Sequence, residues 1–279
     1  LVGSEMCIRD SRNGVISDYI MTERMLKIYV KSAIAKRKIW GKPNICVCVP
    51  SGVTDVQRRA ACDAVYRTGA KNVYVLEEPF AAAIGAGVDI ESAVGAMVVD
   101  IGAGTTDIAI VARGGVQHSS SIKIGGDDFD EAIIRYMRKR HNVLLGESSA
   151  EQLKKDIGSV YPREQDAIGY ARGKELVRGL PTKMAVKSSE MIEACQEETD
   201  QILDSVREML EAAPPELVSD ISEHGIILAG GGSKIFGMDK LIMDKIGVPV
   251  VNIKNPDQVV ATGAGTAHYY IKDGRTLEE

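Results

Sequence analysis

Residues that build disulfide bonds and metal sites are scarce in this sequence. The histidines are His118, His141, His224 and His268, and the cysteines are Cys7, Cys46, Cys48, Cys62 and Cys195. The histidines are scattered singly, which argues against a zinc site. No pair of cysteines has C-x-x-C spacing, so we expect buried, unpaired thiols and a reducing compartment.

Positive charge and long apolar runs are also lacking. The 34 Lys and Arg residues are outnumbered by 39 Asp and Glu, and the net charge of -5 argues against a general nucleic-acid-binding protein. No apolar run approaches the roughly 18 residues of a membrane span. The absence of G-x-x-x-x-G-K-[ST] excludes a Walker P-loop. With 279 residues, 44% of them hydrophobic, the chain can form one large or two ordinary domains.

Strand and helix patterns alternate along the chain, which predicts an α/β fold. Residues 1–12 lack periodicity and are interpreted as a non-native leader. A helical repeat over 22–34 contains Met25, Leu26, Ile28, Tyr29 and Ala33. A strand over 44–49, a helix over 54–69 and a strand over 72–78 follow it. Thr54 and Gln57 have capping-box spacing and Gly69 suits the helix end, so a parallel strand pair with a right-handed crossover is expected.

The second half of the chain predicts a further α/β segment. An apolar hairpin spans 97–111, then come the strand "SSSIKIGG" and the helix "DDFDEAIIRYMRKR". A polar stretch over 146–181 with several Gly and Pro indicates an inserted subdomain. One long helix is expected over 189–213, where Pro214-Pro215 ends it, and "GIILAGGGSKIFGMDKLI" predicts a strand, a glycine loop and a helix.

The hairpin turn "DIGAGTTD" joins features that conflict unless a ligand is present. Backbone amides near Gly102 and Gly104 suit anionic oxygens, yet the Asp100 carboxylate would repel a phosphate. A bridging Mg²⁺ resolves this conflict, because it keeps several waters and links few carboxylates to phosphate oxygens. Thr105 can donate its hydroxyl to a phosphate or to water. A decorated structural hairpin is the alternative for this turn alone.

Two other segments add to the candidate site. Glu78 ends a strand before Pro79 and an alanine-rich helix, where it serves either as an ordinary helix N-terminal anion or as a group that polarises a water beside a γ-phosphate. The three glycines Gly230–Gly232 let a flat base or a phosphate approach the main chain, and Ser233 can cap a helix. By itself this glycine run is equally a tight turn.

These segments together resemble the MreB family of rod-shape-determining bacterial actin homologues, from about Gly14 almost to the C-terminus. The matching stretches are "VPSGVTDVQRRA", "EEPFAAAIGAG", "VVDIGAGTTD", "IGGDDFDEAI" and "PPELVSDISEHGIILAGGG". The resemblance implies an actin-like fold, of the ribonuclease H-like Hsp70–actin ATPase type, with ATP and Mg²⁺ in a cleft between two α/β domains. We expect domain I at 13–92 plus 257–279 and domain II at 93–256, with its small subdomain near 129–190.

The resemblance also implies roles for individual residues. Asp100 would hold the water shell of Mg²⁺, and Gly102, Ala103, Gly104 and Thr105 would cradle the β- and γ-phosphates. Glu78 and Thr105 would position the hydrolytic water. Glu151 and Lys154 would contact the nucleoside, although their spacing alone predicts a surface ion pair. Gly231, Gly232, Ser233 and Lys234 would flank the adenine.

The sequence departs from the family pattern in two places. Ala103 replaces a glycine, which a β-turn accepts if φ there is negative. The family's first phosphate loop, D-L-G-T-A-N-T, and the small subdomain after it do not occur. We therefore interpret the chain as an N-terminally truncated copy with an incomplete first domain and half of the phosphate clamp, which leaves ATP binding and a weak ATPase activity of this chain open.

A basic loop offers a candidate membrane contact. "AKRKIWGKPN" contains the only tryptophan, Trp40, beside Ile39 and among Lys36, Arg37, Lys38 and Lys42. Trp40 either folds back over the sheet edge or inserts with Ile39 into an anionic lipid surface. The resemblance favours insertion, because the family's membrane-binding loop falls at this position.

Three functions are compatible with an actin-like fold. The resemblance implies a cytoplasmic, membrane-associated homopolymer at the inner face of the cell membrane, which guides peptidoglycan synthesis with membrane morphogenesis and cell wall elongation proteins. An Hsp70-type chaperone ATPase shares the hairpin and the E-P-x-A-A-A motif, but only about thirty residues follow Pro249. A sugar kinase is the third alternative, and no convincing set of hexose-binding residues is found.

Overall fold

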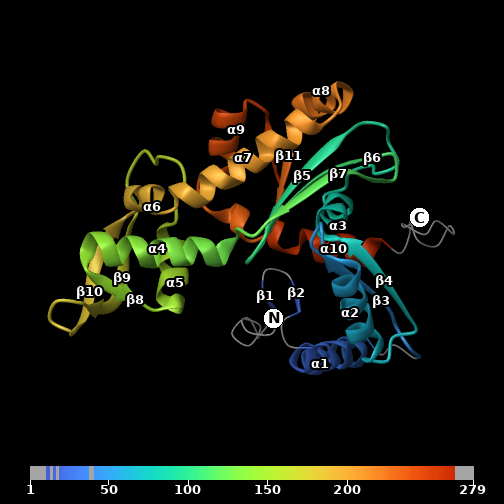
Figure 1. Cartoon of the computed structure of the whole chain (residues 1–279), viewed down its shortest axis with the longest axis horizontal. Coiled ribbons are helices and arrows are strands. Elements are labelled where there is room, and N and C mark those ends of the chain that lie inside the picture. The colour runs from blue at the N-terminus through green and yellow to red at the C-terminus, as the bar shows by residue number, and fades with distance from the viewer. Residues whose placement is uncertain (1–10, 13–14, 17–18, 38–40, 268–279) are drawn as a thin grey trace.

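The computed structural model describes residues 11–12, 15–16, 19–37 and 41–267. A mixed five-stranded sheet forms its centre, in the order β12-β11-β5-β6-β7 (Figure 1). Strands β12, β11 and β5 are parallel, and β5, β6 and β7 are antiparallel. The bounds are β5 Ala96–Ile101, β6 Thr106–Ala112, β7 Gly115–Ile122, β11 Ile226–Ala229 and β12 Val250–Asn252. The predicted apolar hairpin is thus confirmed as β5 and β6.

One face of this sheet supports the larger hydrophobic core. Alternation along β5 points Met97, Val99 and Ile101 to this face, where they belong to one cluster with buried side chains of six helices. Four of these helices are α4 Gly126–His141, α7 Gln196–Ala212, α8 Pro215–His224 and α9 Met238–Ile246. The expected long helix over 189–213 is wrong: α6 Ser188–Ala194 and α7 are separate, because the chain leaves helical geometry at Cys195 (φ -99°, ψ 7°).

The opposite face of the sheet packs on two short helices, α3 Glu78–Gly85 and α10 Val259–Thr266. Two glycines allow their backbones to touch. A Cβ at Gly85 would lie 2.0 Å from the Val259 carbonyl oxygen, and one at Gly263 would lie 1.7 Å from that of Ala81. Val98 of β5 and Val111 of β6 complete this smaller core.

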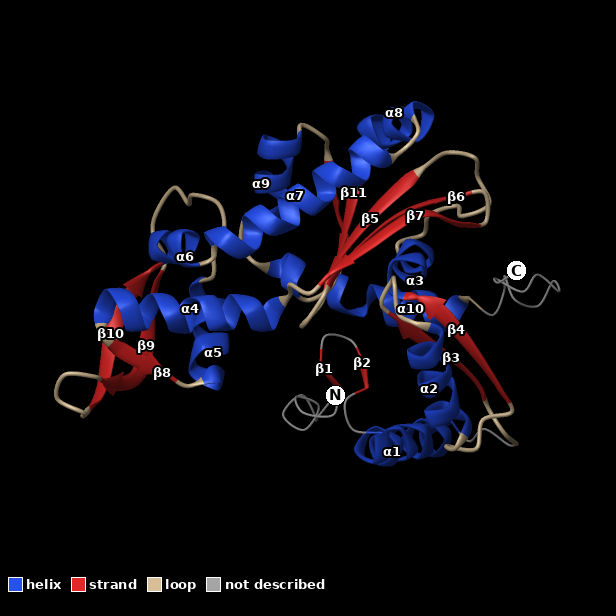
Figure 2. Cartoon of the chain, in the orientation of Figure 1, coloured by secondary structure: helices blue, strands red, loops and turns tan. Residues whose placement is uncertain are grey.

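The N-terminal elements form a separate layer beside α3 and α10 (Figure 2). They comprise β1 Ser11–Arg12, β2 Val15–Ile16, α1 Tyr19–Arg37, β3 Asn44–Val49, α2 Asp55–Tyr66 and β4 Asn72–Glu77. The parallel pairing of β3 with β4 is confirmed, as is the capping box of Thr54 and Gln57. Helix α1 occurs as predicted, but Ile28 is not on a core face: it is 67% exposed.

A small lobe lies at the far end of α4 (Figure 2). Its antiparallel sheet, in the order β10-β9-β8, consists of β8 Val143–Leu145, β9 Ile168–Glu175 and β10 Pro181–Lys187. Helix α5 Glu147–Ile157 covers one face, where Leu153 and Ile157 leave no room for a side chain at Gly169.

The cysteine prediction holds in part. Cys46, Cys48, Cys62 and Cys195 are all free thiols. Only Cys195 is buried, whereas the other three are half-buried, so the expectation of uniformly buried thiols is wrong. Cys46 and Cys48 lie in β3, whose sheet has only one partner strand among the described residues.

Candidate functional site

Three carboxylates from three elements meet on the α3 side of the central sheet. Asp100 of β5 and Asp107 of β6 are directly opposite each other in the antiparallel ladder. Glu78 begins α3, which packs on both strands. Asp100 is 4% exposed and Asp107 is 1% exposed, and none of the three carboxylates forms an ion pair within the described residues. Like charges at opposed ladder positions destabilise a sheet, so this arrangement calls for a neutralising group.

Burial and mutual repulsion hold these carboxylates back from ionising. Burial raises the pKa of Glu78 to about 8, and the charges of Asp107 and Asp100 add to this effect. Burial beside Asp107 raises the pKa of Asp100 to about 7. The pKa of Asp107 is also raised, mainly by burial. Each group would ionise more readily next to a cation.

Asp107 was missed by sequence reasoning. Its Oδ1 accepts a hydrogen bond from the Ser51 amide at 2.7 Å, and the Ser51 hydroxyl donates to Glu77 Oε2 at 2.6 Å. The other oxygen, Oδ2, is buried without a hydrogen-bond partner. Strand alternation could have predicted this position. The two-residue repeat places Asp107 on the same face of the sheet as Val111, away from the larger core.

The glycine turn between β5 and β6 is closed by a hydrogen bond from the Gly102 amide to the Thr105 carbonyl at 2.8 Å. Ala103 does not have a positive φ, so the turn meets the condition for accepting alanine in place of glycine. The amides of Ala103 and Gly104 donate to no group in the part of the chain that the structure describes. They are therefore available for a ligand.

Helix α4 begins directly against this turn. The amides of Gly126 and Asp127 donate to the carbonyls of Gly102 and Ala103, at 2.9 and 2.8 Å. A Cβ at Gly125 would lie 2.4 Å from the Ala103 carbonyl oxygen, so a glycine is required there for close approach. The start of α4 thus fixes the turn in place, and its first amides are already occupied.

The two residues of α5 that were predicted to contact the nucleoside do not form the ion pair that their sequence spacing suggests. Lys154 Nζ donates to the Gly126 carbonyl at 2.5 Å and to Asp130 Oδ2 at 2.8 Å. Glu151 pairs with Lys155 at 2.6 Å. The alternative of an ion pair between Glu151 and Lys154 is therefore wrong, because Lys154 reaches across to α4 instead.

The glycine run after β11 serves two purposes. A Cβ at Gly230 or Gly232 would lie 2.2 or 2.4 Å from atoms of Ile101, so both glycines permit packing within the protein. A Cβ at Gly231 would meet nothing within 4 Å, which leaves open space. Ser233 does not cap a helix: it lies in the 3₁₀ turn Gly232–Lys234 and donates to the Gly230 carbonyl at 2.7 Å. Lys234 pairs with Asp257 at 2.6 Å, beside the 3₁₀ turn Pro256–Gln258.

The carboxylates fit a hydrated cation rather than a metal bound by protein alone. No group of three or more His, Cys, Asp or Glu side chains among the described residues is arranged to hold a metal ion. A nearby cation would counter both the raised pKa values, which burial mainly causes, and the unpartnered state of Asp107 Oδ2. Mg²⁺ meets both observations, because it keeps several waters and shares its remaining ligands with phosphates.

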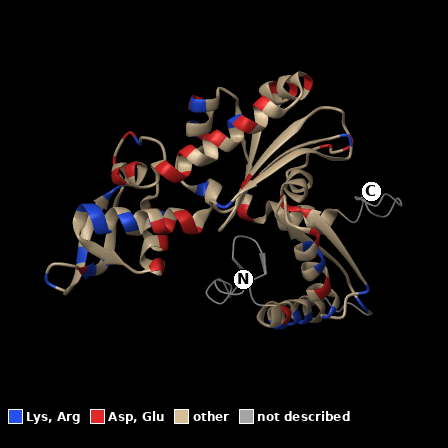
Figure 3. Cartoon of the chain, in the orientation of Figure 1, with Lys and Arg blue, Asp and Glu red and all other residues tan. Residues whose placement is uncertain are grey.

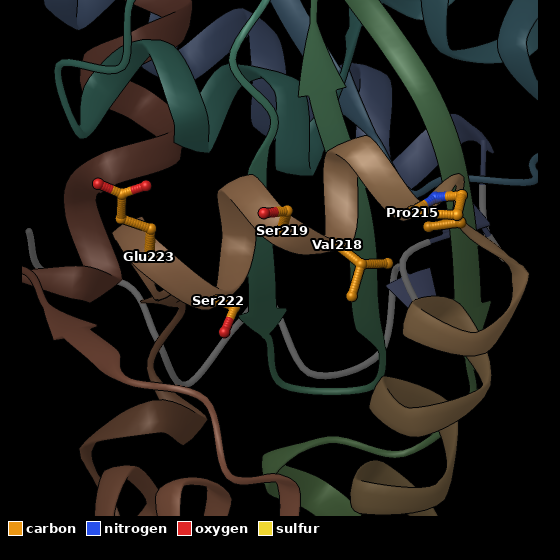
Figure 4. A pocket seen from close by; sticks show the side chains of 6 residues that line it. Pro215, Val218, Ser219, Ser222 and Glu223 are labelled. Carbon is orange, nitrogen blue, oxygen red and sulfur yellow. The ribbon is translucent and has the colours of Figure 1, made fainter.

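Two other regions lie away from these residues. A surface depression lies along α8 (Figure 4), and none of the predicted site residues lines it. It is lined by Ala213, Pro215, Val218, Ser219, Ser222 and Glu223. The candidate membrane residues Ile39 and Trp40 lie outside the described residues, and no described helix is long and apolar enough to cross a membrane.

Comparison with solved structures defines the class of this protein. Its fold is that of the actin-like proteins. It resembles the MamK double helical filament with a TM-score of 0.79 over 93% of this chain and 80% of that one, at 23% identity. The structure of MreB5 of Spiroplasma citri bound to ADP has a TM-score of 0.89 and 34% identity, and the match covers 95% of this chain and 79% of that one.

Sequence comparison then identifies the family. The model of the MreB/Mbl protein family matches residues 3–276, and the chain belongs to this family. It is 44% identical over 265 residues to the cell shape-determining protein MreB of Escherichia coli strain K12, covering 95% of this chain and 76% of that protein. It is 40% identical over 263 residues to Mbl of Bacillus subtilis strain 168, covering 94% and 79%. This membership favours the first of the three functions considered and gives no support to a chaperone or a sugar kinase.

Proposed function

We propose that this protein is an ATP-dependent, filament-forming determinant of cell shape, with the nucleotide phosphates bound at the turn between β5 and β6. The observation that supports this most directly is the turn itself. Two amides without a partner among the described residues, those of Ala103 and Gly104, adjoin the two buried carboxylates and the half-buried Glu78, none of which has an ion-pair partner there. An anionic ligand with a divalent cation satisfies both sets of groups at once.

In the proposed site, separate residues would bind the phosphates, hold the Mg²⁺ water shell and orient the attacking water. Gly102, Ala103, Gly104 and Thr105 would cradle the β- and γ-phosphates through backbone amides and the threonine hydroxyl. Asp100 would hold the water shell of Mg²⁺, which neutralises phosphate charge when it is bound. Glu78 and Thr105 would orient the attacking water, and the raised pKa of Glu78 would suit it to accept a proton near neutral pH.

The nucleoside would lie between α5 and the glycine run after β11. The residues proposed for it are Glu151, Lys154, Gly231, Gly232, Ser233 and Lys234. The open space at Gly231 supports close approach of a flat base. The Lys154 ammonium is held by Gly126 and Asp130, so this residue would contact the nucleoside mainly through its aliphatic stem.

The separate sheets β3-β4 and β12-β11-β5-β6-β7 support a two-domain arrangement around this site. Domain I would comprise 13–92 and 257–279, domain II would comprise 93–256, and the lobe near 129–190 would be its small subdomain. Such an arrangement would let a bound nucleotide draw the two domains together and so favour assembly.

Self-assembly is supported by the uneven charge of the surface. Asp and Glu residues follow α7 and α8, whereas Lys and Arg residues gather at the end of α4 and around β9 and β10 (Figure 3). Unlike surfaces on one chain favour a head-to-tail contact, which propagates a filament when it does not close. The relatives named as cell shape-determining proteins support that role, and the actin-like MamK neighbour was solved as a double helical filament.

Sedimentation of the gene product that contains this chain tests the proposal. We expect pelleting with ATP and Mg²⁺, and little without nucleotide. Glu78→Ala should keep ATP-dependent pelleting and lower the hydrolysis rate by roughly 10²-fold or more, because it removes the group that orients water. A protein that binds no ATP and stays in the supernatant under all conditions would refute the proposal.

The filaments would act at the inner face of the cell membrane, where they would guide cell wall synthesis with membrane morphogenesis proteins. The loop around Ile39 and Trp40 supports this, because aromatic and basic residues favour an anionic interface, and repetition along a filament multiplies weak contacts. Trp40 is the only tryptophan, so its emission reports insertion directly. We expect a blue shift with anionic vesicles and none with neutral ones; an unchanged spectrum from assembled protein would contradict membrane insertion.

A further inference from the structure

The loop after α5, residues 158–163, is fastened to the chain that follows the glycine run. The Val160 amide donates to the Phe236 carbonyl at 2.9 Å. Gly237 has a φ of 84°, and a Cβ there would lie 2.3 Å from the Cβ of Tyr161, so the two backbones approach closely. The two segments proposed to flank the nucleoside are therefore joined just beyond the point where each of them ends.

The side chain of Arg163 forms a second link between the same two segments. Its guanidinium carbon lies 3.7 Å from the centre of the Phe236 ring, inside the limit of about 6 Å for a cation–π contact. Its Nη2 donates to the carbonyl of Gly158, which ends α5, at 3.2 Å. Arg163 forms no ion pair within the described residues, so the ring and this carbonyl are its recorded partners.

The position of Arg163 carries an energetic cost. Its Nε is buried without a hydrogen-bond partner, which is unfavourable for a donor and calls for an explanation. Lys240 also reaches the Phe236 ring, at 5.4 Å from its centre, but Lys240 and Phe236 belong to the same segment of the chain. Of these two cations, only Arg163 connects the end of α5 to the ring.

We infer that Arg163 is a positioning residue that sets the distance between α5 and the glycine run after β11. This inference rests on the proposed function, in which α5 contacts one side of the nucleoside and the glycine run lies against the other. By stacking on Phe236 and holding Gly158, Arg163 would keep these two segments at the separation that adenosine requires. It would strengthen the binding of ATP and leave the groups that orient the attacking water unchanged.

Arg163→Ala tests this role in the gene product that contains this chain. We expect KM for ATP to rise about three- to tenfold while kcat stays within about twofold, because binding is weakened and the chemical step is not. Phe236→Leu should have the same effect, and the double variant should add little to either single change. The matched control is Lys240→Ala, which removes a cation from the same ring without touching the loop after α5. It should leave both constants within about twofold.

A second measurement needs no nucleotide. Exchange of the Val160 amide, which bonds to the Phe236 carbonyl, should be at least about threefold faster in Arg163→Ala and unchanged in Lys240→Ala. An unchanged KM or an unchanged Val160 exchange rate in Arg163→Ala, or equal effects in Lys240→Ala, would overturn the inference and leave the proposed function intact. Faster exchange in a protein that neither binds nor hydrolyses ATP would instead refute the proposed function and leave the link between the two segments established.

Discussion

The strands on the two sides of the candidate site are packed very differently. Every residue of β6 is buried, and β5 is buried from Met97 to Ile101. In β3 only Val49 is buried, and in β4 only Leu76. The turn between β5 and β6 thus joins two enclosed strands, whereas Ser51, which touches Asp107, belongs to a lightly packed layer. A rigid half can present the ligand groups while a softer half adjusts to what is bound.

The largest test of this contrast is a matched pair of core truncations. Ile110→Ala removes a fully buried side chain of β6 and should lower the free energy of unfolding by about 2–5 kcal/mol. Ile45→Ala removes the same atoms from half-buried β3 and should cost about 1 kcal/mol. Chemical denaturation of both variants measures the difference. Equal losses would show that the two layers are packed alike.

The next effect concerns the joint between α3 and α10. Gly263→Ala places a methyl group 1.7 Å from the Ala81 carbonyl oxygen, so the two helices must separate. We expect a loss of about 1–3 kcal/mol or somewhat more, together with faster amide exchange in α3. Gly265→Ala is the control on the same helix, since a Cβ there meets nothing within 4 Å. A loss at both positions would instead indicate a general effect on α10.

The third prediction concerns pH. The pKa values of Glu78 and Asp100 are about 8 and 7 in the folded protein, against ordinary values of 4.5 and 3.8. At pH values between the ordinary and the raised pKa of each group, the folded state therefore binds more protons than the unfolded state. Its free energy of unfolding falls as the pH rises through this range. From pH 6 to pH 8 the nucleotide-free protein should lose about 3–4 kcal/mol. Glu78→Gln should reduce this slope, and Glu147→Gln, at an exposed position of α5, should not.

The smallest effect is at the first turn of α2. Thr54→Ala removes the hydroxyl that accepts from the Gln57 amide and should cost about 1 kcal/mol. Thr54→Ser, which keeps the acceptor, should restore most of this stability. Thermal unfolding monitored by circular dichroism can compare the two. An unchanged midpoint in Thr54→Ala would mean that α2 unfolds independently of the site.

Local rules predicted much of the fold from the sequence. The capping box of α2, the parallel β3–β4 pair, the hairpin of β5 and β6 and the end of α7 before Pro214 all depend on neighbouring residues. The break at Cys195 was missed, because no glycine or proline marks it and apolar periodicity continues through it. The exposure of Ile28 was missed for a related reason: a helical repeat does not reveal whether a partner covers the face.

The sequence predicted the parts of the candidate site that depend on local backbone shape. It did not predict the contacts between residues that are distant in the chain. Glycine spacing predicted the turn between β5 and β6, but it did not distinguish Gly231, which faces open space, from Gly230 and Gly232, which pack on Ile101. The pairing of Lys154 with Asp130, rather than with Glu151, depends on how α5 crosses α4, which residue spacing does not encode. Asp107 lay within the quoted motif, but its opposition to Asp100 follows only from the strand register.

The backbone contact between Gly85 and Gly263 has a mechanical consequence. This contact joins α3 to α10, the last described helix, and α3 begins at Glu78. Tension applied near the end of α10 would reach α3 directly, without first pulling any strand from its sheet. Under the proposed function, a neighbouring subunit that pulls on this end would shift Glu78 at the start of α3 and so change the rate of hydrolysis.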